Sequence, residues 1–136
     1  MIVAGCVITD DYDRILLLHR NSSSSSWWEL PGGQADEDEL PETAAVRAVS
    51  ETLGVSATLT RSLGNAVYED DEEVSVYWFR ARLIGREPDI IDDGEYDDLA
   101  YFDMEDMMGL ALSASTGLLM EKIYNGEVAI GDDTVV

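Results

Sequence analysis

Short apolar runs separated by acidic turns set the pattern of the N-terminal part of the chain. The runs Ile2–Thr9 and Arg14–His19 flank Asp10-Asp11-Tyr12-Asp13, where aspartate side chains favour a turn because they hydrogen-bond the nearby backbone. Two strands joined as a hairpin are therefore predicted. No apolar run approaches the length of about 20 residues that a membrane-spanning helix needs.

A second pair of runs follows the same plan. The segments Ser56–Tyr68 and Val74–Leu83 flank the acidic turn Glu69–Glu72 and predict two more strands. In the later strand the period of two places Val74, Val76, Trp78, Arg80 and Arg82 on one face, with Tyr77, Phe79, Ala81 and Leu83 on the other. A further short run, Leu99–Phe102, follows the acidic loop Asp89–Asp98.

The segment Leu40–Gly54 has a helical period. Pro41 suits the first turn, where its missing N–H costs nothing, and Gly54 is a natural terminator. One side of the helix is an apolar stripe that is predicted to pack on a sheet, namely Val46, Val49 and Leu53. The opposite side, which is not predicted to pack on that sheet, consists of Ala44, Ala48, Glu51 and Thr52. Ser113–Asn125 is predicted to form a closing helix.

The charge of the chain is strongly negative. It holds 29 acidic and 8 basic residues, a net charge of -21. Such a chain repels nucleic acid and anionic membranes, which excludes both as partners. One hypothesis is a saline cytoplasm, because a Debye length of about 3 Å at 1 M salt screens the self-repulsion. The alternative is an ordinary acidic protein.

Length and composition fit one soluble domain over residues 1–136. The N-terminus has no basic lead before its apolar residues, so we expect no signal peptide and a cytoplasmic protein. The single cysteine, Cys6, lies within an apolar run, which favours a buried thiol over a nucleophile. His19 ends a predicted strand, where a rim position is favoured over a catalytic role.

Candidate chemistry gathers between Trp28 and Val55. Leu30-Pro31-Gly32-Gly33 is predicted to end an apolar strand in a turn that requires positive φ, which only glycine adopts cheaply. A helix carboxylate that faces exposed carbonyls of this turn is a plausible site for a hard cation. The alternative is an exposed helix face without a ligand.

The spacing of this stretch resembles the Nudix signature, Gly-x5-Glu-x7-Arg-Glu-U-x-Glu-Glu-x-Gly-U with U apolar. The match lies at Gly33, Glu39, Arg47, Val49, Glu51, Gly54 and Val55. The preceding Trp28-x-Leu-Pro-Gly-Gly is also typical of that family. The resemblance covers essentially the whole chain and implies an α/β/α sandwich with a mixed β-sheet.

The resemblance also implies a divalent metal, because the helix glutamates of Nudix hydrolases hold Mg²⁺ or Mn²⁺ against a diphosphate. Here Ala48 and Thr52 replace two of those three glutamates, and Glu51 remains. The resemblance assigns Glu51 to the metal together with the carbonyl of Gly32, and assigns Arg47 to orienting Glu39 and Glu51. Mg²⁺ can still be held weakly by one carboxylate plus substrate phosphates.

Other candidates lie outside the signature. The segment Glu95–Tyr101 resembles a Nudix loop-to-strand passage in which an acid ahead of an aromatic residue binds metal or acts as base. The resemblance makes Glu95 the first candidate for that role and Asp98 the second. Arg20 and Arg80 could meet a phosphate or simply pair with surface acids. Of the adjacent tryptophans, one should pack in the core and the other, with Trp28 the candidate, could stack on a flat group.

Two functions are predicted on this basis. The first is a Mg²⁺- or Mn²⁺-dependent hydrolase of a nucleoside diphosphate linked to another moiety, weakened by Ala48 and Thr52. The second is a Nudix-fold protein that binds a nucleotide or related ligand without efficient turnover. The substrate is left open, and so is the oligomeric state, with a homodimer among the alternatives.

Overall fold

The strands pair into two sheets in a computed structural model that describes residues 1–21, 26–91 and 95–130. The strands within these ranges are β1 (Ile2–Val7), β2 (Ile15–Asn21), β3 (Ser26–Glu29), β4 (Gly32–Gln34), β5 (Ser56–Asp70), β6 (Glu72–Ile84) and β7 (Tyr96–Phe102). The helices are α1 (Pro41–Leu53), α2 (Met104–Met107) and α3 (Ala114–Tyr124).

The larger sheet is mixed and has the order β4-β1-β6-β5. Its central strand β1 runs parallel to β6 and antiparallel to β4, while β5 and β6 form a long antiparallel hairpin. The smaller sheet is antiparallel and has the order β3-β2-β7. The architecture is therefore the predicted mixed-sheet α/β fold.

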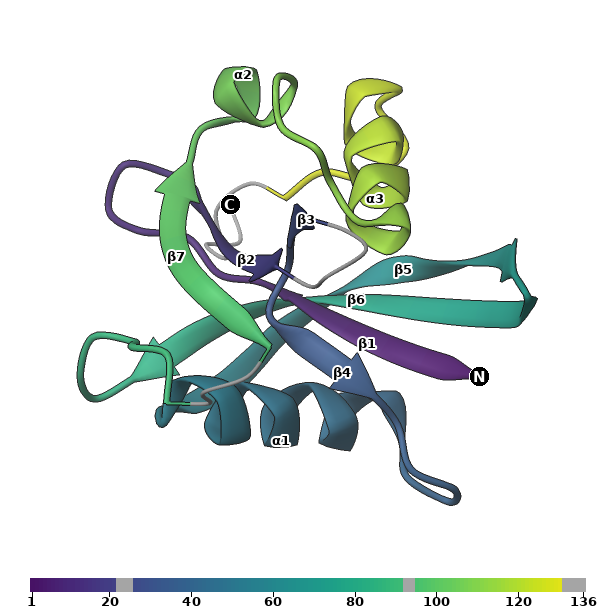
Figure 1. The fold of residues 1–136 in the computed structure, drawn as a ribbon, viewed down its shortest axis with the longest axis horizontal. Helices are drawn as coiled ribbons and strands as arrows, with labels where there is room; N and C mark the ends of the chain where they lie inside the picture. The colour runs from purple at the N-terminus through teal and green to yellow at the C-terminus, as the bar shows by residue number, and fades with distance from the viewer. Residues whose placement is uncertain (22–25, 92–94, 131–136) are drawn as a thin grey trace.

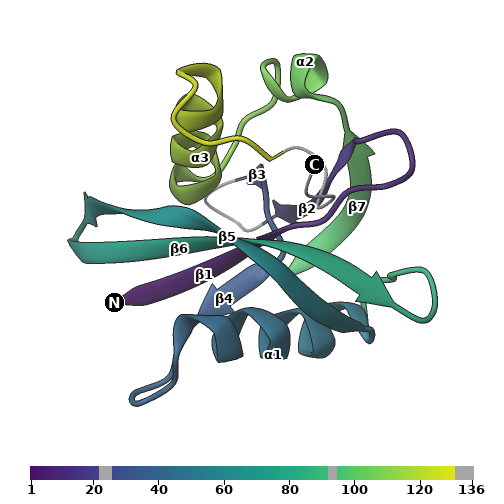
Figure 2. The same cartoon turned by 180° about the vertical axis from the view of Figure 1, so that it is seen from behind.

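Helices lie on both sides of the larger sheet (Figure 1; seen from behind in Figure 2). On one side α1 packs through Val49 and Leu53 in a core that includes Phe79 of β6. On the other side α3 packs through Leu119 and Met120 in a core that includes Trp78. Adjacent residues of β6 thus face opposite cores, as the predicted period of two requires. The chain forms an α/β/α sandwich.

The four long strands are confirmed with shifted ends, but the predicted hairpin of the first two is wrong. Beyond the bridge between Thr9 and Ile15 the chain diverges, so that β1 pairs in the larger sheet and β2 in the smaller one. The first strand ends at Val7 rather than Thr9, although Thr9 still bridges Ile15. The last begins at Tyr96 rather than Leu99, because pairing with β2 carries the acidic residues of the loop into the ladder. Within the predicted polar loop at residues 21–26, Asn21 and Ser26 belong to strands, and residues 22–25 lie outside the described part of the chain.

Helix α1 has the predicted bounds but a different buried face. Ala44 and Ala48, expected opposite the packed stripe, are 0% and 6% exposed, whereas Val46 is only half-buried. The prediction was wrong here because alanine allows the sheet to approach closely, so the face with small residues carries much of the contact. The N-cap is Leu40, and Gly54 ends the helix with a φ of 66°.

The closing helix is confirmed by its caps. Ser113 is the N-cap of α3, and its Oγ accepts a hydrogen bond from the amide of Thr116. The described residues contain no helix that is both long and apolar enough to cross a membrane.

Candidate functional site

Two glycines line the part of β4 that faces α1. The predicted turn with positive φ is wrong for both, since Gly32 and Gly33 lie in a strand that pairs with β1. Among the described glycines, those with positive φ are Gly54, Gly64, Gly85 and Gly126. Glycine is needed here for close approach instead. A Cβ at Gly32 would lie 2.0 Å from the carbonyl oxygen of Ala4, and one at Gly33 would lie 3.2 Å from the Cβ of Ala48.

Arg47 of α1 joins the helix to the segment that precedes it. Its Nε and Nη2 donate to the two carboxylate oxygens of Glu39, each at 2.8 Å. Its Nη2 also donates to the carbonyl of Gln34 at 3.0 Å, and its Nη1 to Glu51 at 3.2 Å. The sequence-based proposal that Arg47 orients Glu39 and Glu51 is consistent with this geometry. The bidentate pair fixes Glu39 most firmly.

Glu39 is held in its charged form. Its side chain is 12% exposed, and hydrogen bonds from Arg47 and from the amide of Asp36 lower its pKa to about 2. The pKa of Arg47 is raised in return by the same hydrogen bond. This pair therefore stays ionised at any ordinary pH and serves as a structural clamp between loop and helix.

Glu51 lies at the open end of this network. Its side chain is 64% exposed, and the contact with Arg47 is a surface i,i+4 pair. Such pairs are weak, so a competing cation with phosphate attached can displace the arginine. The adjacent Thr52 is half-buried, and its carbonyl accepts the amide of Ile91 at 3.0 Å.

The two other acidic candidates have local partners of their own. Glu95 is 58% exposed, with its Oε1 3.9 Å from Arg20. The carboxylate of Asp98, within β7, accepts a hydrogen bond from the amide of Leu99 at 2.8 Å. Within residues 1–21, 26–91 and 95–130, no three His, Cys, Asp or Glu side chains gather closely enough to hold a metal ion. The donor set thus fits an ion that brings its own phosphate ligands, and does not fit a resident metal centre.

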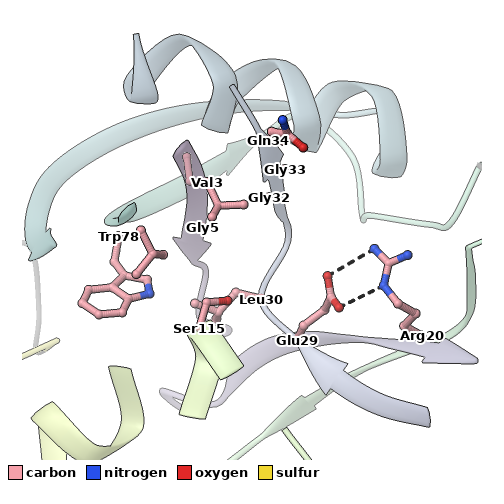
Figure 3. A pocket seen from close by; sticks show the side chains of 12 residues that line it. Val3, Gly5, Arg20, Glu29, Leu30, Gly32, Gly33, Gln34, Trp78 and Ser115 are labelled. Atoms are coloured by element: carbon pink, nitrogen blue, oxygen red, sulfur yellow. Dashed lines mark hydrogen bonds and ion pairs between the residues drawn. The ribbon is translucent and has the colours of Figure 1, made fainter. Parts of the chain in front are cut away.

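A cavity of about 170 Å³ opens beside β4 (Figure 3). It is lined by β1, β4 and β6, with Arg20 and Glu29 on one side and Ser115 of α3 on another. Arg20 donates from Nε to Glu29 at 3.0 Å and from Nη2 to the hydroxyl of Tyr96 at 2.8 Å. Glu29 also accepts from Tyr96 and from the indole of Trp27. One arginine and one carboxylate therefore stand together at the cavity.

Burial and the neighbouring Glu29 carboxylate raise the pKa of Tyr96. Its hydroxyl consequently stays protonated and donates to Glu29 at 2.9 Å. The ion pair with Glu29 likewise raises the pKa of Arg20. Arg20 is therefore a permanent cation at this cavity, but one whose charge is already matched by a carboxylate.

Two sequence candidates lie elsewhere. Trp28 packs edge-on against Phe102 at 4.8 Å between ring centroids and tilts against His19 at 4.9 Å. Arg80 is 7% exposed and donates to the hydroxyl of Thr9 at 3.0 Å. It lines a separate groove of about 770 Å³ formed by residues 8–14, 80–83, 85–88 and 101. The structure does not bring Arg80 and Arg20 to the same cavity.

The remaining predictions from single residues concern His19 and Cys6. His19 Nδ1 lies 2.6 Å from a carboxylate oxygen of Asp97, and this hydrogen bond lowers the pKa of Asp97. The histidine therefore lies at the rim, as predicted. Cys6 is fully buried, and burial raises the pKa of its thiol to about 12, so it is an inert thiol.

Three residues of the cavity escaped the sequence reasoning. Glu29 sits at the unspecified position of Trp28-x-Leu-Pro, and Trp78 was assigned only to a strand face. Ser115 lies in the first turn of α3, far along the chain from the other lining residues. A charged residue between two apolar ones in a short strand was the one available signal, and it pointed to Glu29.

The fold is a small α/β/α domain with a mixed sheet. In its candidate site, α1 with the Arg47 network packs against the two glycines of β4, and a cavity lies beside that strand. The NUDIX domain profile matches residues 1–121, so the chain belongs to the Nudix family.

Similar proteins agree with this assignment. An 8-oxo-dGTP diphosphatase of Proteus vulgaris is 28% identical over 80 residues, which cover 57% of this chain and 71% of that protein. A diphosphoinositol polyphosphate phosphohydrolase 3-beta of Bos taurus is 36% identical over 72 residues, 53% of this chain and 43% of that protein. The second match therefore spans less than half of its relative.

A solved structure covers more of the chain. The MutT NUDIX hydrolase from Burkholderia pseudomallei superposes with a TM-score of 0.78 and 26% identity, over 90% of this chain and 96% of that one. The two sequence relatives differ in the substrates that their names give. Fold and family therefore leave the substrate of this chain undecided.

Proposed function

We propose that this chain is a Nudix-type hydrolase of a nucleoside diphosphate linked to another moiety, with turnover weakened by Ala48 and Thr52. The observation that carries the proposal is the Arg47 network, because it retains Glu39 and leaves Glu51 on the exposed end of a weak pair. The related diphosphatase from Proteus vulgaris supports the reaction class.

The proposal assigns the divalent ion to the substrate complex. Glu51 is the helix carboxylate available to it, with the Gly32 carbonyl as the proposed second protein ligand. Bound there, Mg²⁺ or Mn²⁺ would neutralise phosphate charge and lower the pKa of a bound water. The described residues hold no ready cluster of three ligands, so affinity for the free ion should be low.

The side chains of the protein position the proposed metal ligand and the proposed base. Arg47 restrains Glu51 through one hydrogen bond while its bidentate pair with Glu39 keeps the guanidinium fixed. Glu95, with Asp98 as the second candidate, remains the proposed base. Glu95 is preferred because its exposed carboxylate has a long contact with Arg20 at 3.9 Å, whereas the carboxylate of Asp98 accepts the amide of Leu99 at 2.8 Å.

A second candidate function is ligand binding without efficient turnover. The observation in its favour is the burial of Ala48 against Gly33, since an alanine in that contact offers no oxygen to a metal. In this case the cavity beside β4 would bind a nucleotide-like ligand, and the Arg47 network would be purely structural.

A panel of nucleoside diphosphate derivatives with Mg²⁺ and Mn²⁺ separates these functions. We expect slow release of nucleoside monophosphate from at least one compound, and a loss of about 100-fold in Glu51→Gln, the order of size for a group that stabilises transition-state charge. Product analysis by chromatography gives the rate, and thermal shift with the same compounds gives binding.

Glu42→Gln is the matched control, because Glu42 is an exposed glutamate in the first turn of the same helix. It should retain full turnover. Binding of a panel member without any hydrolysis would favour the second function. Hydrolysis that is equal in the wild type and Glu51→Gln would remove Glu51 from the mechanism.

A further inference from the structure

A row of glycines crosses the larger sheet at the cavity. Gly5 of β1 pairs with Gly32 of β4 on one side and with Trp78 of β6 on the other, and Trp78 pairs in turn with Gly64 of β5. Paired residues of adjacent strands lie about 4.5 to 5.5 Å apart. Trp78 is therefore the only residue with a side chain in this row of four paired residues. The hollow beside its indole exists because Gly5, its neighbour on β1, has no Cβ.

The indole of Trp78 has an unused donor at this hollow. Trp78 is 1% exposed, and its Nε1 has no hydrogen-bond partner among the residues that the structure describes. Figure 3 shows the nitrogen-bearing edge turned toward Leu30 and Ser115, on the cavity side. A Cβ added at Gly5 would lie 3.6 Å from Cδ1, the atom next to Nε1. Gly5 therefore places no side chain against that edge of the indole.

A buried N–H without a partner is costly, so native proteins rarely retain one without a reason. The cost disappears when a ligand supplies an acceptor. Of the other walls near this edge, Val3, Leu30 and Val76 are apolar and Ser115 is polar. The apolar walls would hold a flat group by contact area, and the indole N–H would face that group as a donor without a partner of its own.

The size of the cavity limits what enters. A cavity of about 150 Å³ lined by apolar side chains accommodates benzene. The volume here, about 170 Å³, therefore suits one ring and is too small for a whole nucleoside. The ring would enter edge-first with an acceptor leading toward Trp78, while the rest of the ligand extends past Arg20 and Glu29 on the other side of the same cavity.

We infer that Trp78 is a specificity-determining residue: its Nε1–H donates a hydrogen bond to a ring acceptor, a carbonyl oxygen or a ring nitrogen, on the ligand that enters this cavity. The inference deepens the proposed function and rests on it for the nucleotide nature of the ligand. It does not depend on hydrolysis.

The first experiment observes the donor directly in the wild-type protein. The three indole N–H signals in a ¹⁵N-labelled sample are assigned with the variants Trp27→Phe, Trp28→Phe and Trp78→Phe, and UDP, GDP and ADP are titrated in. We expect at least one nucleotide to move the Trp78 signal downfield and to slow its exchange with solvent. Trp78→Phe, which keeps an aromatic ring but has no donor, should weaken that nucleotide by about tenfold, the worth of one buried hydrogen bond.

Two further variants distinguish the effect of the indole N–H from the effect of the free volume beside it. Gly5→Ala should weaken the same nucleotide by filling the hollow while leaving the donor in place, because its Cβ contacts are at van der Waals distance. Tyr124→Phe also removes a single side-chain donor, but this donor bonds the carbonyl of Met104 away from the cavity, so its affinity should equal that of the wild type. Melting temperatures report whether each variant is folded.

A pair of small rings tests the inference apart from nucleotides. Pyridine and benzene have the same size, and only pyridine carries an acceptor. Pyridine should bind more tightly than benzene and move the Trp78 signal downfield, and Trp78→Phe should abolish this preference. Because this comparison needs no nucleotide, it decides the inference even if the panel reveals neither binding nor hydrolysis and the proposed function fails.

The inference is overturned if a nucleotide binds, or is hydrolysed, while the Trp78 signal stays in place and Trp78→Phe retains full affinity. That result would leave the proposed function standing and would assign the indole donor to a buried water. Equal binding of pyridine and benzene, or binding of neither, would overturn it as well.

Discussion

Individual glycines decide how closely the layers of this protein approach one another. Gly32 allows β4 to lie against the carbonyl of Ala4, and Gly33 allows α1 to lie against β4 through Ala48. Neither role needs an unusual backbone angle. At this scale the Gly-Gly pair is a packing device, which also explains why Ala48 is buried rather than presented to a ligand.

Gly32→Ala tests the packing role. The new methyl would lie 2.0 Å from a backbone oxygen that cannot move aside cheaply, so we expect a loss of about 3 kcal/mol in the free energy of unfolding. Chemical denaturation measures it. Gly117→Ala in α3 is the control: a Cβ there meets nothing within 4 Å, so the variant should gain about 0.5 to 1 kcal/mol from helix propensity. Equal stability of the two variants would contradict the packing role of Gly32.

At the scale of the element, the side chain of Arg47 within α1 holds the segment that precedes the helix. Its N-cap is Leu40, which supplies no side-chain hydrogen bond. Arg47 instead reaches back to Glu39 and to the carbonyl of Gln34. The same arginine contacts Glu51 one turn further on, so the clamp that orders the segment before the helix also positions the proposed ligand.

The clamp predicts a specific acid dependence. The pKa of Glu39 falls from 4.5 to about 2 on folding, so its contribution to stability is complete above about pH 4.5. It is lost progressively as the pH falls toward 2. Glu39→Gln should therefore be less stable than the wild type at pH 7, and the difference should shrink between pH 5 and pH 2.

Urea denaturation at a series of pH values measures this difference, and Glu42→Gln corrects for the general effect of removing one negative charge. Glu42 lies exposed in the first turn of α1. A gap between Glu39→Gln and the wild type that stays constant down to pH 2 would show that the contribution of Glu39 does not depend on its ionisation.

At the scale of the whole molecule, charge is the dominant feature. A net charge of -21 on 136 residues is spread over turns, hairpins and loops, and the few arginines are used locally in pairs such as Arg14 with Asp10 and Arg20 with Glu29. Local pairing leaves most of the acidic surface unbalanced. Self-repulsion therefore opposes the compact state wherever salt does not screen it.

Thermal melts in KCl test the hypothesis of a saline cytoplasm. The Debye length falls from about 10 Å at 0.1 M to about 3 Å at 1 M, so the melting temperature should rise steadily over this range at pH 7. The rise should be smaller at pH 4, where part of the acidic surface is protonated. A melting temperature that is independent of KCl at pH 7 would contradict the hypothesis and favour an ordinary acidic protein.

The sequence by itself determined the longer strands, the two main helices and the family, but not β4, which lies where a turn was predicted. Apolar runs between acidic turns locate β1, β2, β5 and β6 to within a few residues, and a period of two gives the faces of β6, because both patterns are local properties of the chain. The bounds of α1 followed from Pro41 and Gly54 for the same reason. The spacing of Gly33, Glu39 and Arg47 correctly indicated the Nudix family.

Only the tertiary structure decided which residues meet. Gly5, Gly32 and Trp78 come from three strands far apart in sequence, and the row that they form depends on strand register, which no local pattern reveals. The same holds for Glu29 with Arg20 and Tyr96, and for Arg80, which the fold places in a separate groove. Local periodicity fixes which face a side chain occupies, whereas the partner across that face is set by long-range packing.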